Sequence, residues 1–276
     1  MKSLVKQFVF GIWRKCVPRR ARNSLRLWLM LEMPDRAPQL IEEFSGPVVV
    51  LAPHMDDEII GPGGAVIRHV QSGAAVTFIF MTDGNAGDPQ GGPPLSETRK
   101  SESRSAAQIV GVNDLIFLDG PDGALDATPE IVAALQRILV EKKPAVIYLP
   151  ALTDHHHDHW ATNRILRKVL DRLPDPLARN LVIRGYEVWT ALPANRMADI
   201  TAVAETKKKA IAVFQSQTRF VDYSRAIIGL NQYRSMMRLE GRGYAEGFLQ
   251  MTNQEYRKFF DRISLNVRFG EGDPAD

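Results

Sequence analysis

The sequence predicts an α/β fold in which a mostly parallel sheet carries helices on both faces. From Gly46 onward, short runs rich in β-branched residues alternate with segments of helical length, which is the pattern of a parallel sheet with crossover helices. The chain has 276 residues, of which 45% are hydrophobic and 24% charged, an ordinary composition for a globular protein. Neither a linker nor an internal repeat divides the alternating part, so we expect it to be one large domain.

The predicted sheet begins with Val48–Leu51, which is apolar throughout and is therefore expected to be a parallel strand buried on both faces. A helix that ends at Gly73 follows, and Val76–Met81 is the second strand. The segment Asp83–Pro94 is rich in Gly and Pro without periodicity, which predicts a loop. Because this loop follows a strand end, it lies where α/β proteins place ligand-binding loops.

The alternation continues through the next 100 or so residues. The expected elements are a helix over Leu95–Val110 ended by Gly111, a strand over Leu115–Leu118, a helix over Pro129–Lys142, a strand over Ala145–Leu149, a helix from about Trp160 to Leu173, a strand over Leu181–Trp189 and a helix over Thr206–Phe214. Right-handed crossovers make this order Rossmann-like. From about residue 215 the signals are weak, and we expect that part to cap a domain spanning 46–276.

Residues 1–45 differ from the rest, and we expect them to form a basic amphipathic arm. Residues 1–31 contain eight Lys or Arg and no acidic residue. Six apolar residues recur there with helical spacing and form one stripe that ends before Pro18. They are Leu4, Val5, Phe8, Val9, Ile12 and Trp13. Two interpretations remain open: the stripe lies on an anionic membrane surface as a peripheral contact, or it packs against the domain or a partner subunit.

Charge and composition exclude several classes of protein. Without those eight basic residues, 27 Lys and Arg face 32 Asp and Glu, so the body of the chain is not expected to bind nucleic acid. No uncharged apolar run approaches the roughly 20 residues that span a bilayer, and the N-terminus fits a signal peptide poorly. Cys16 is the single cysteine, which excludes an internal disulfide framework. We expect the protein to be cytoplasmic. The basic arm leaves open a peripheral contact with the inner face of the membrane.

Two clusters of polar residues each follow the end of a predicted strand. Pro53–Glu58 reads PHMDDE, and Asp154–His159 reads DHHHDH and holds four of the six histidines. Because the carboxyl ends of parallel strands meet at the same edge of a sheet, we expect the clusters to converge although about 100 residues separate them. Histidine and aspartate are ligands that a catalytic zinc ion accepts. The sequence therefore predicts a metal site at this edge.

These clusters resemble the motifs of a known family. Pro53–Glu58 resembles the PHPDDE motif, and Asp154, His156, Asp158 and His159 resemble the D-x-H-x-D-H motif, of the PIG-L (LmbE-like) zinc-dependent N-deacetylases. The resemblance extends over the blocks Arg99–Val112, Tyr186–Trp189, Asp199–Thr201 and Lys209–Gln217, and thus over roughly residues 46–220. It implies an LmbE-like fold and a hydrolase that removes an N-acetyl group from an amino sugar such as N-acetylglucosamine.

Carried over residue by residue, the resemblance implies that His54, Asp57 and His159 bind zinc and that Asp56 is the general base. Three protein ligands leave a fourth position for water, whose pKa zinc lowers from about 15.7 toward 7. A carboxylate beside that water can then accept its proton. The same three ligands also accept other divalent metals.

The resemblance assigns roles to three further residues. His156 would stabilise the tetrahedral intermediate and donate a proton to the leaving amine. Asp158 would orient a histidine through a hydrogen bond. Arg99 resembles a residue that contacts substrate, and its guanidinium could donate to sugar hydroxyls or a phosphate. A solvated charge on a helix is the competing interpretation of Arg99.

One position departs from the family motif, because Met55 stands where the motif has proline. This change removes a constraint on φ without altering a ligand. His155 and His157 would enter the site only in a shifted register, and the pair Asp158–His159 favours the alignment above. Gly61–Gly64 lacks the G-x-G-x-x-G spacing of a dinucleotide site, so we interpret these glycines as allowing close helix packing below the metal loop.

The predicted function is therefore zinc-dependent removal of an N-acetyl group from an amino sugar or glycoconjugate. Two alternatives remain open: hydrolysis of another small amide, and a non-catalytic sugar-binding protein on the same fold. Asp56 distinguishes the enzymes from the binding protein, because sugar binding needs no base beside three intact ligands.

Overall fold

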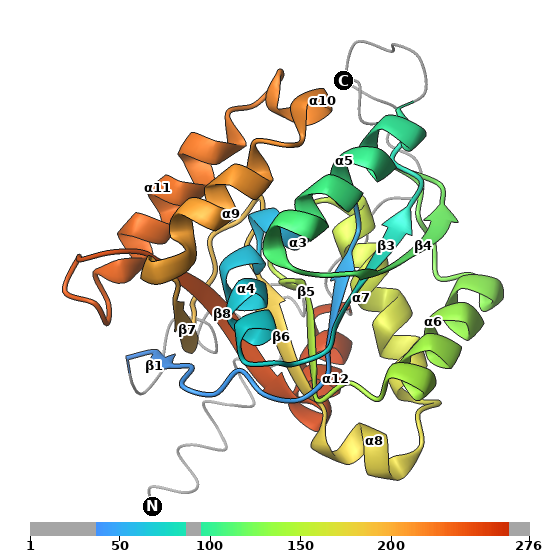
Figure 1. The fold of residues 1–276 in the computed structure, drawn as a ribbon. Helices are drawn as coiled ribbons and strands as arrows, with labels where there is room; N and C mark the ends of the chain where they lie inside the picture. The colour runs from blue at the N-terminus through green and yellow to red at the C-terminus, as the bar shows by residue number, and fades with distance from the viewer. Residues whose placement is uncertain (1–36, 87–94, 265–276) are drawn as a thin grey trace, which may run out of the picture.

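The computed structural model describes residues 37–86 and 95–264 (Figure 1). The strands are β1 (Gln39–Leu40), β2 (Val48–Ala52), β3 (Val76–Thr82), β4 (Asp114–Gly120), β5 (Val146–Pro150), β6 (Val182–Tyr186), β7 (Arg196–Asp199) and β8 (Ala245–Thr252). The helices are α3 (Asp57–Ile60), α4 (Gly63–Gln71), α5 (Ser96–Val110), α6 (Pro129–Lys142), α7 (His157–Leu170), α8 (Asp175–Asn180), α9 (Ala204–Ile211), α10 (Gln215–Thr218), α11 (Tyr223–Ser235) and α12 (Asn253–Ser264), with a 3₁₀ turn at Thr201–Val203.

The described strands form one eight-stranded sheet in the order β1-β7-β8-β6-β5-β2-β3-β4. Every neighbouring pair is parallel except those of β8, which runs antiparallel to β6 and β7. After β2 the chain builds β3 and β4 on one side, and it then returns to place β5 and β6 on the other side. The boundary between β2 and β5 is thus the topological switch point, and the carboxyl ends of these two strands border the crevice where ligands bind in such sheets.

Helices cover both faces of the sheet, as the sequence predicts (Figure 1). Val48, Val50 and Ala52 of β2 join one core cluster with residues of α4, α5 and α9. Val49 and Leu51 join a second cluster with residues of α6, α7 and α12. All five residues of β2 are buried, and burying one Val or Leu side chain contributes about 1.5–3 kcal/mol to stability. The two-sided burial explains why this strand reads as a continuous apolar run.

Two glycines below the loop that follows β2 are required by close packing. A Cβ at Gly61 would lie 2.2 Å from Tyr186 Cδ2, and a Cβ at Gly64 would lie 2.5 Å from Ile200 Cγ2. Neither distance is compatible with a side chain unless the neighbour moves. The interpretation of Gly61–Gly64 as a packing motif is therefore confirmed.

The start of a helix follows the available cap. α6 begins and ends at the predicted residues. Its start is explained by Pro129 in the first turn and by Thr128, which caps the helix by accepting a hydrogen bond from the Ile131 amide at 3.4 Å. α7 begins at His157, three residues before the predicted Trp160. His156 caps that helix, and its Nδ1 accepts a hydrogen bond from the Asp158 amide at 3.2 Å.

The segment from residue 215 is more than the cap that the sequence predicts. It contributes β8 to the interior of the sheet, between β6 and β7, and α12 to one of the two cores. Glu246 and Gly247 interrupt the apolar pattern of β8, so the strand has no alternation that a sequence reading could detect. Glu246 is nevertheless buried, because an ion pair with Lys207 compensates its charge.

Residues 1–36 lie outside the described part of the chain, so the predicted N-terminal helix stays a prediction. Within residues 37–86 and 95–264, no helix combines the length and apolarity that crossing a membrane requires.

Candidate active site

The loop after β2 carries the first polar cluster on a strained turn. Asp56 has φ 140° and ψ −31°, a conformation that costs a non-glycine residue on the order of 1–3 kcal/mol. The Asp56 amide donates to Glu58 Oε2 at 2.8 Å, and Glu58 is fully buried. This buried hydrogen bond stabilises the turn. Strain of this kind persists where surrounding contacts determine the backbone, and it is common at functional sites.

The second cluster is placed by the loop between β5 and α7. Asp154 Oδ1 accepts a hydrogen bond from the His156 amide at 3.0 Å, which fixes the turn that leads into the helix. Asp158 and His159 then lie in the first turn of α7 and are fully buried. Both clusters thus reach the switch point from neighbouring strands, as the sequence predicts.

The structure brings together His54, Asp57 and His159. Asp57 Oδ2 lies 3.4 Å from His54 Nδ1 and 3.4 Å from His159 Nε2. His156 completes the group, because its ring centroid lies 4.7 Å from that of His54 and 4.9 Å from that of His159. One ring nitrogen from each of the three histidines lies within 4.8 Å of the other two. Two or three imidazoles and one carboxylate are thus available to a single ion.

Electrostatics within this group favour a bound cation. Burial lowers the pKa of His159, but Asp57 and Asp154 outweigh it and raise that pKa to about 9. Burial raises the pKa of Asp57, but His159 and His54 outweigh it and hold that pKa below its usual range. Neither ring nitrogen of the buried His159 has a partner in hydrogen-bond geometry among the described residues. The carboxylates therefore stabilise positive charge between them, and nitrogen and oxygen donors of this kind fit zinc.

Two carboxylates lie behind His54. Its Nε2 is 3.0 Å from Asp158 Oδ2 and 3.1 Å from Asp122 Oδ1. Asp158 is itself fixed by the amides of Gly123 at 2.7 Å and Leu125 at 3.0 Å. Hydrogen bonds of this kind orient a metal-binding imidazole and select its tautomer. Asp122 is absent from the predicted site, although its position two residues after β4 is the same strand-end signal that identifies the other clusters.

The predicted base and the predicted substrate residue face each other. Arg99 Nη2 lies 3.6 Å from Asp56 Oδ2 and donates to the Met55 carbonyl at 3.0 Å. Burial raises the pKa of Asp56 to about 7, with Asp57 adding to the effect and Arg99 opposing it. Arg99 is only 3% exposed, so it is not a solvated helix charge. Its guanidinium supports the loop of Asp56 from inside the site.

A cavity of about 130 Å³ opens onto these groups. It is lined by His54, Asp56, Asp57, Ile60, Ala86, Arg99, Asp122, His156, Val188, Trp189, Gln217 and Tyr223. His159 and Asp158 lie behind the lining. Trp189, Gln217 and Tyr223 are absent from the predicted site, since they come from later segments whose sequence patterns give no position relative to β2.

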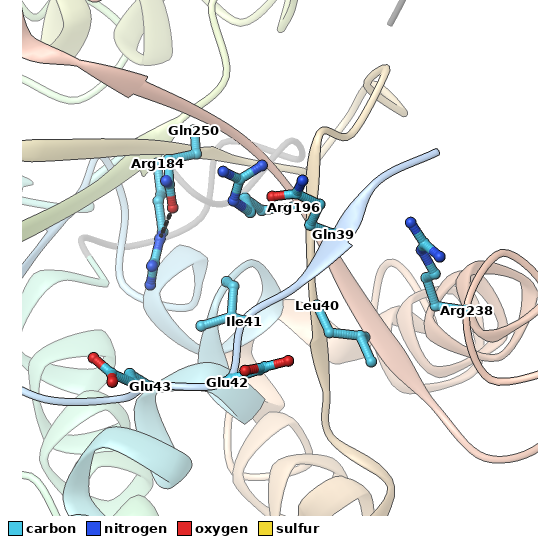
Figure 2. Close-up of a pocket in the computed structure, with 9 residues that line it drawn as sticks. All are labelled: Gln39, Leu40, Ile41, Glu42, Glu43, Arg184, Arg196, Arg238 and Gln250. Carbon is cyan, nitrogen blue, oxygen red and sulfur yellow. Dashed lines mark hydrogen bonds between the residues drawn. The ribbon is translucent and has the colours of Figure 1, made fainter. Parts of the chain in front are cut away.

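A larger cavity of about 680 Å³ lies elsewhere, and Figure 2 shows its lining. Its residues are Gln39, Leu40, Ile41, Glu42, Glu43, Arg184, Arg196, Arg238 and Gln250. Arg184 is engaged by Gln250, whose Oε1 accepts from Nε at 2.9 Å, and Arg238 donates to the Pro38 carbonyl. The lining contains no histidine and none of the predicted site residues, so volume alone does not identify the active site.

The chain is similar to known deacetylases. Residues 49–170 match the family model described as PIG-L: GlcNAc-PI de-N-acetylase. Diacetylchitobiose deacetylase of Thermococcus kodakarensis is 26% identical over 185 residues, which are 62% of this chain and 69% of that protein. A probable N-acetyl-alpha-D-glucosaminyl L-malate deacetylase 2 of Bacillus anthracis is 28% identical over 138 residues, which are 46% of this chain and 61% of that protein. The matched relatives are thus deacetylases of N-acetylglucosamine-related compounds, and the second is matched over less than two thirds of its length.

The fold also matches solved structures. N,N'-diacetylchitobiose deacetylase from Pyrococcus horikoshii superposes with a TM-score of 0.65 at 24% identity, over 76% of this chain and 85% of that one. At this identity the likeness concerns the fold, and it agrees with the mixed sheet and its two helical layers.

Proposed function

The chain carries a PIG-L family domain, and on that premise we propose that it is a metal-dependent hydrolase that removes the N-acetyl group of an amino sugar or glycoconjugate. The observation that supports this most strongly is the convergence of His54, Asp57 and His159 beside Asp56. These residues come from the segments that follow β2 and β5, about 100 positions apart in the sequence, and they meet at the switch point of the sheet.

His54, Asp57 and His159 are the residues that would hold the metal, which we take to be zinc although another divalent ion fits the same donors. Bound there, zinc would supply a water of lowered pKa and so a hydroxide at neutral pH. The chain itself orients the donors: Asp158 and Asp122 engage His54 Nε2, and Asp154 faces His159 Nδ1 at 3.1 Å.

Asp56 is the proposed general base. Its carboxyl group is buried beside the donor group and lines the cavity, where it can accept a proton from a water molecule. The attacking water gives that proton to Asp56 while its oxygen bonds to the amide carbonyl carbon. The C–N bond then breaks, the amine leaves with a proton, and acetate is released. Arg99 holds the carboxylate of Asp56 beside the cavity.

His156 is proposed to act on the other side of the scissile bond. Its Nδ1 accepts the Asp158 amide, which leaves Nε2 to face the ligand. An N–H there can donate to the carbonyl oxygen as charge develops and to the leaving nitrogen. Asp158 thus contributes twice, since its amide positions His156 and its carboxylate orients His54.

Hydrolysis of a different small amide and sugar binding without turnover are the alternatives. Asp56 favours an enzyme, because a strained, buried carboxylate beside the donor group has no use in sugar binding alone. The relatives favour an N-acetylated sugar over other amides.

Acetate release from N-acetylglucosamine compounds tests the proposal, with wild type, Asp56→Asn and a control Asp126→Asn compared at equal metal content. Asp126 is exposed and lines no part of the cavity. We expect Asp56→Asn to retain the metal and to lower kcat by about 100-fold or more, and Asp126→Asn to match wild type. Unchanged turnover in Asp56→Asn would exclude it as the base, and a wild type that releases no acetate from any such compound would exclude the function.

A further inference from the structure

We infer that the cavity of about 680 Å³ beside β1 and β7 is a second binding site, for a small molecule that carries a phosphate monoester group. This cavity shares no lining residue with the cavity at Asp56. Its ligand is therefore separate from the proposed substrate, and the inference does not depend on the proposed function.

The second cavity lies toward the edge of the sheet opposite the candidate active site. The active site follows the carboxyl ends of β2 and β5, whereas Gln39 and Arg196 are the first residues of β1 and β7. The strand pairings make β1 and β7 run in the same direction as β2 and β5. The two cavities thus lie toward opposite ends of the parallel strands.

One wall of the second cavity is the sheet, and strand register places polar side chains side by side on it (Figure 2). Arg184 of β6 pairs with Gln250 of β8, and Arg196 of β7 pairs with Gln39 of β1. Arg196 also pairs with Phe248, two residues before Gln250. Paired residues, and residues two apart on one strand, project from the same face of a sheet. Two guanidinium groups and two carboxamides therefore line this wall.

Arg184 is a buried cation that no carboxylate balances. It is 8% exposed, and it forms no ion pair with any described residue. Its contacts are to neutral groups: Nε donates to Gln250 Oε1 at 2.9 Å, and Nη1 donates to the Tyr148 hydroxyl at 2.6 Å. Its Nη2 has no acceptor within the described part of the chain. Because a buried charge without a counter-charge is costly, an anion bound in the cavity would compensate Arg184.

Arg196 and Arg238 add positive charge to the same cavity. Arg196 Nη1 donates to the Asn195 carbonyl at 3.0 Å, and Arg238 donates to the carbonyls of Ala37 and Pro38. Neither arginine forms an ion pair within residues 37–86 and 95–264. In the same ranges, Arg196 Nη2 and Arg238 Nη1 have no acceptor, so each guanidinium retains N–H groups for a ligand.

Two acidic residues line the other wall without neutralising these arginines. Glu42 and Glu43 follow β1, and both are exposed (Figure 2). Neither carboxylate forms an ion pair in the described part of the chain. Water and salt screen exposed charges, whereas the buried Arg184 acts in a medium of lower dielectric constant. The electrostatic potential at the sheet wall is therefore positive.

The number of cations and the size of the cavity indicate the class of ligand. A phosphate monoester carries a charge of about −1.5 to −2 and three terminal oxygens, and guanidinium groups donate to such oxygens in pairs. Three arginines match this group better than they match the single charge of a carboxylate. The volume of about 680 Å³ is typical of a site for a whole small molecule. Hydroxyl groups on the rest of the ligand can donate to Glu42 and Glu43.

Glycerol 3-phosphate is the probe, with glycerol and the dicarboxylate succinate as comparison ligands. Calorimetry gives Kd values for wild type, Arg196→Gln and Gln250→Glu. Gln250→Glu places a carboxylate beside Arg184 and removes no cation, so it neutralises the cavity with little change in shape. Arg242→Gln is the control, because Arg242 is exposed and lines no part of the cavity.

We expect Arg196→Gln and Gln250→Glu each to weaken binding of glycerol 3-phosphate by about tenfold or more, and Arg242→Gln to match wild type. Glycerol and succinate should bind wild type at least about tenfold more weakly than the phosphate. If Arg196→Gln does not fold, Gln250→Glu decides the test. Equal binding in all the proteins would place the phosphate elsewhere, for instance on a metal at Asp57, and would overturn the site. A wild type without saturable binding, or with equal affinity for succinate, would also overturn the inference.

Discussion

Lys207 Nζ lies 2.7 Å from Glu246 Oε1, and this buried ion pair joins the helices below the active site to β8. Lys207 also donates to the Ile60 carbonyl at 2.9 Å, at the end of α3. Glu246 accepts from the amides of Gly64 at 2.6 Å and Ala65 at 2.8 Å, in the first turn of α4. The pair therefore caps the end of α3 and the start of α4. α3 begins at Asp57, so these contacts lie within a few residues of the proposed base and metal ligand.

Removing one partner of this pair should destabilise the protein. Lys207→Met leaves Glu246 buried without its counter-charge, and breaking a buried pair in this way costs about 3–5 kcal/mol. Urea unfolding at pH 7 measures the change. Lys208→Met is the matched control, because Lys208 is the exposed neighbour of Lys207 on the same helix. Equal midpoints for the two variants would show that the pair contributes nothing to stability.

Metal content should depend on the converging side chains and not on the neighbouring histidine. We expect wild type to bind about one zinc ion per chain, and His159→Ala and Asp57→Ala to lose it, because each removes one of the three proposed protein ligands. His155→Ala should retain the metal, since His155 is exposed. Elemental analysis of untagged protein after dialysis gives the stoichiometry, and a metal-free wild type that takes up none on reconstitution would contradict the site.

The free energy of unfolding should decrease as the pH is lowered from 7 to 5, because His69 stays neutral in the native state over this range but becomes protonated in the unfolded state. Burial, followed by the charge of Arg184, lowers the pKa of His69 to about 4, against about 6.5 in an unfolded chain. Between these values the unfolded state binds more protons than the native state, so the free energy of unfolding decreases as the pH falls. From pH 7 to pH 5 the expected loss from this group is about 2 kcal/mol.

Urea unfolding of wild type and His69→Gln at pH 7 and pH 5 isolates this contribution, because the other titrating groups are common to both proteins. The pH-dependent loss should be about 2 kcal/mol smaller in His69→Gln, whatever its stability at pH 7. His155→Gln, which changes an exposed histidine, should behave as wild type. The same pH dependence in all three proteins would refute the role of His69.

The basic N-terminal arm carries the remaining prediction. If its apolar stripe lies on a membrane surface, full-length protein should sediment with vesicles that contain anionic lipid, and deletion of residues 1–31 should abolish this. Neutral vesicles are the control, because each basic residue near an anionic surface contributes about 1 kcal/mol. A full-length protein that never sediments with anionic vesicles would leave packing against the domain or a partner as the surviving interpretation.

Sequence periodicity was sufficient to predict the sheet that carries the site. Val48–Leu51 and Ala145–Leu149 are apolar because both faces of a central parallel strand are covered, and helix-length segments between strands require parallel pairing. The direction of the strands then placed Pro53–Glu58 and Asp154–His159 at one edge. The convergence of His54, Asp57 and His159 could thus be expected before any coordinates, because local pattern and strand direction together determine it.

The order of the strands and the surroundings of the site were decided by tertiary structure alone. Contacts between distant segments place β5 beside β2 and bring β8 into the sheet as an antiparallel strand. Such contacts also bring Asp122 and Trp189 to the site. Lys207 illustrates the reason, since it stands before Lys208 and Lys209 and nothing local distinguishes the three. Only the packing of α9 against α3 and β8 buries the first and gives it Glu246 as partner, whereas the other two remain in solvent.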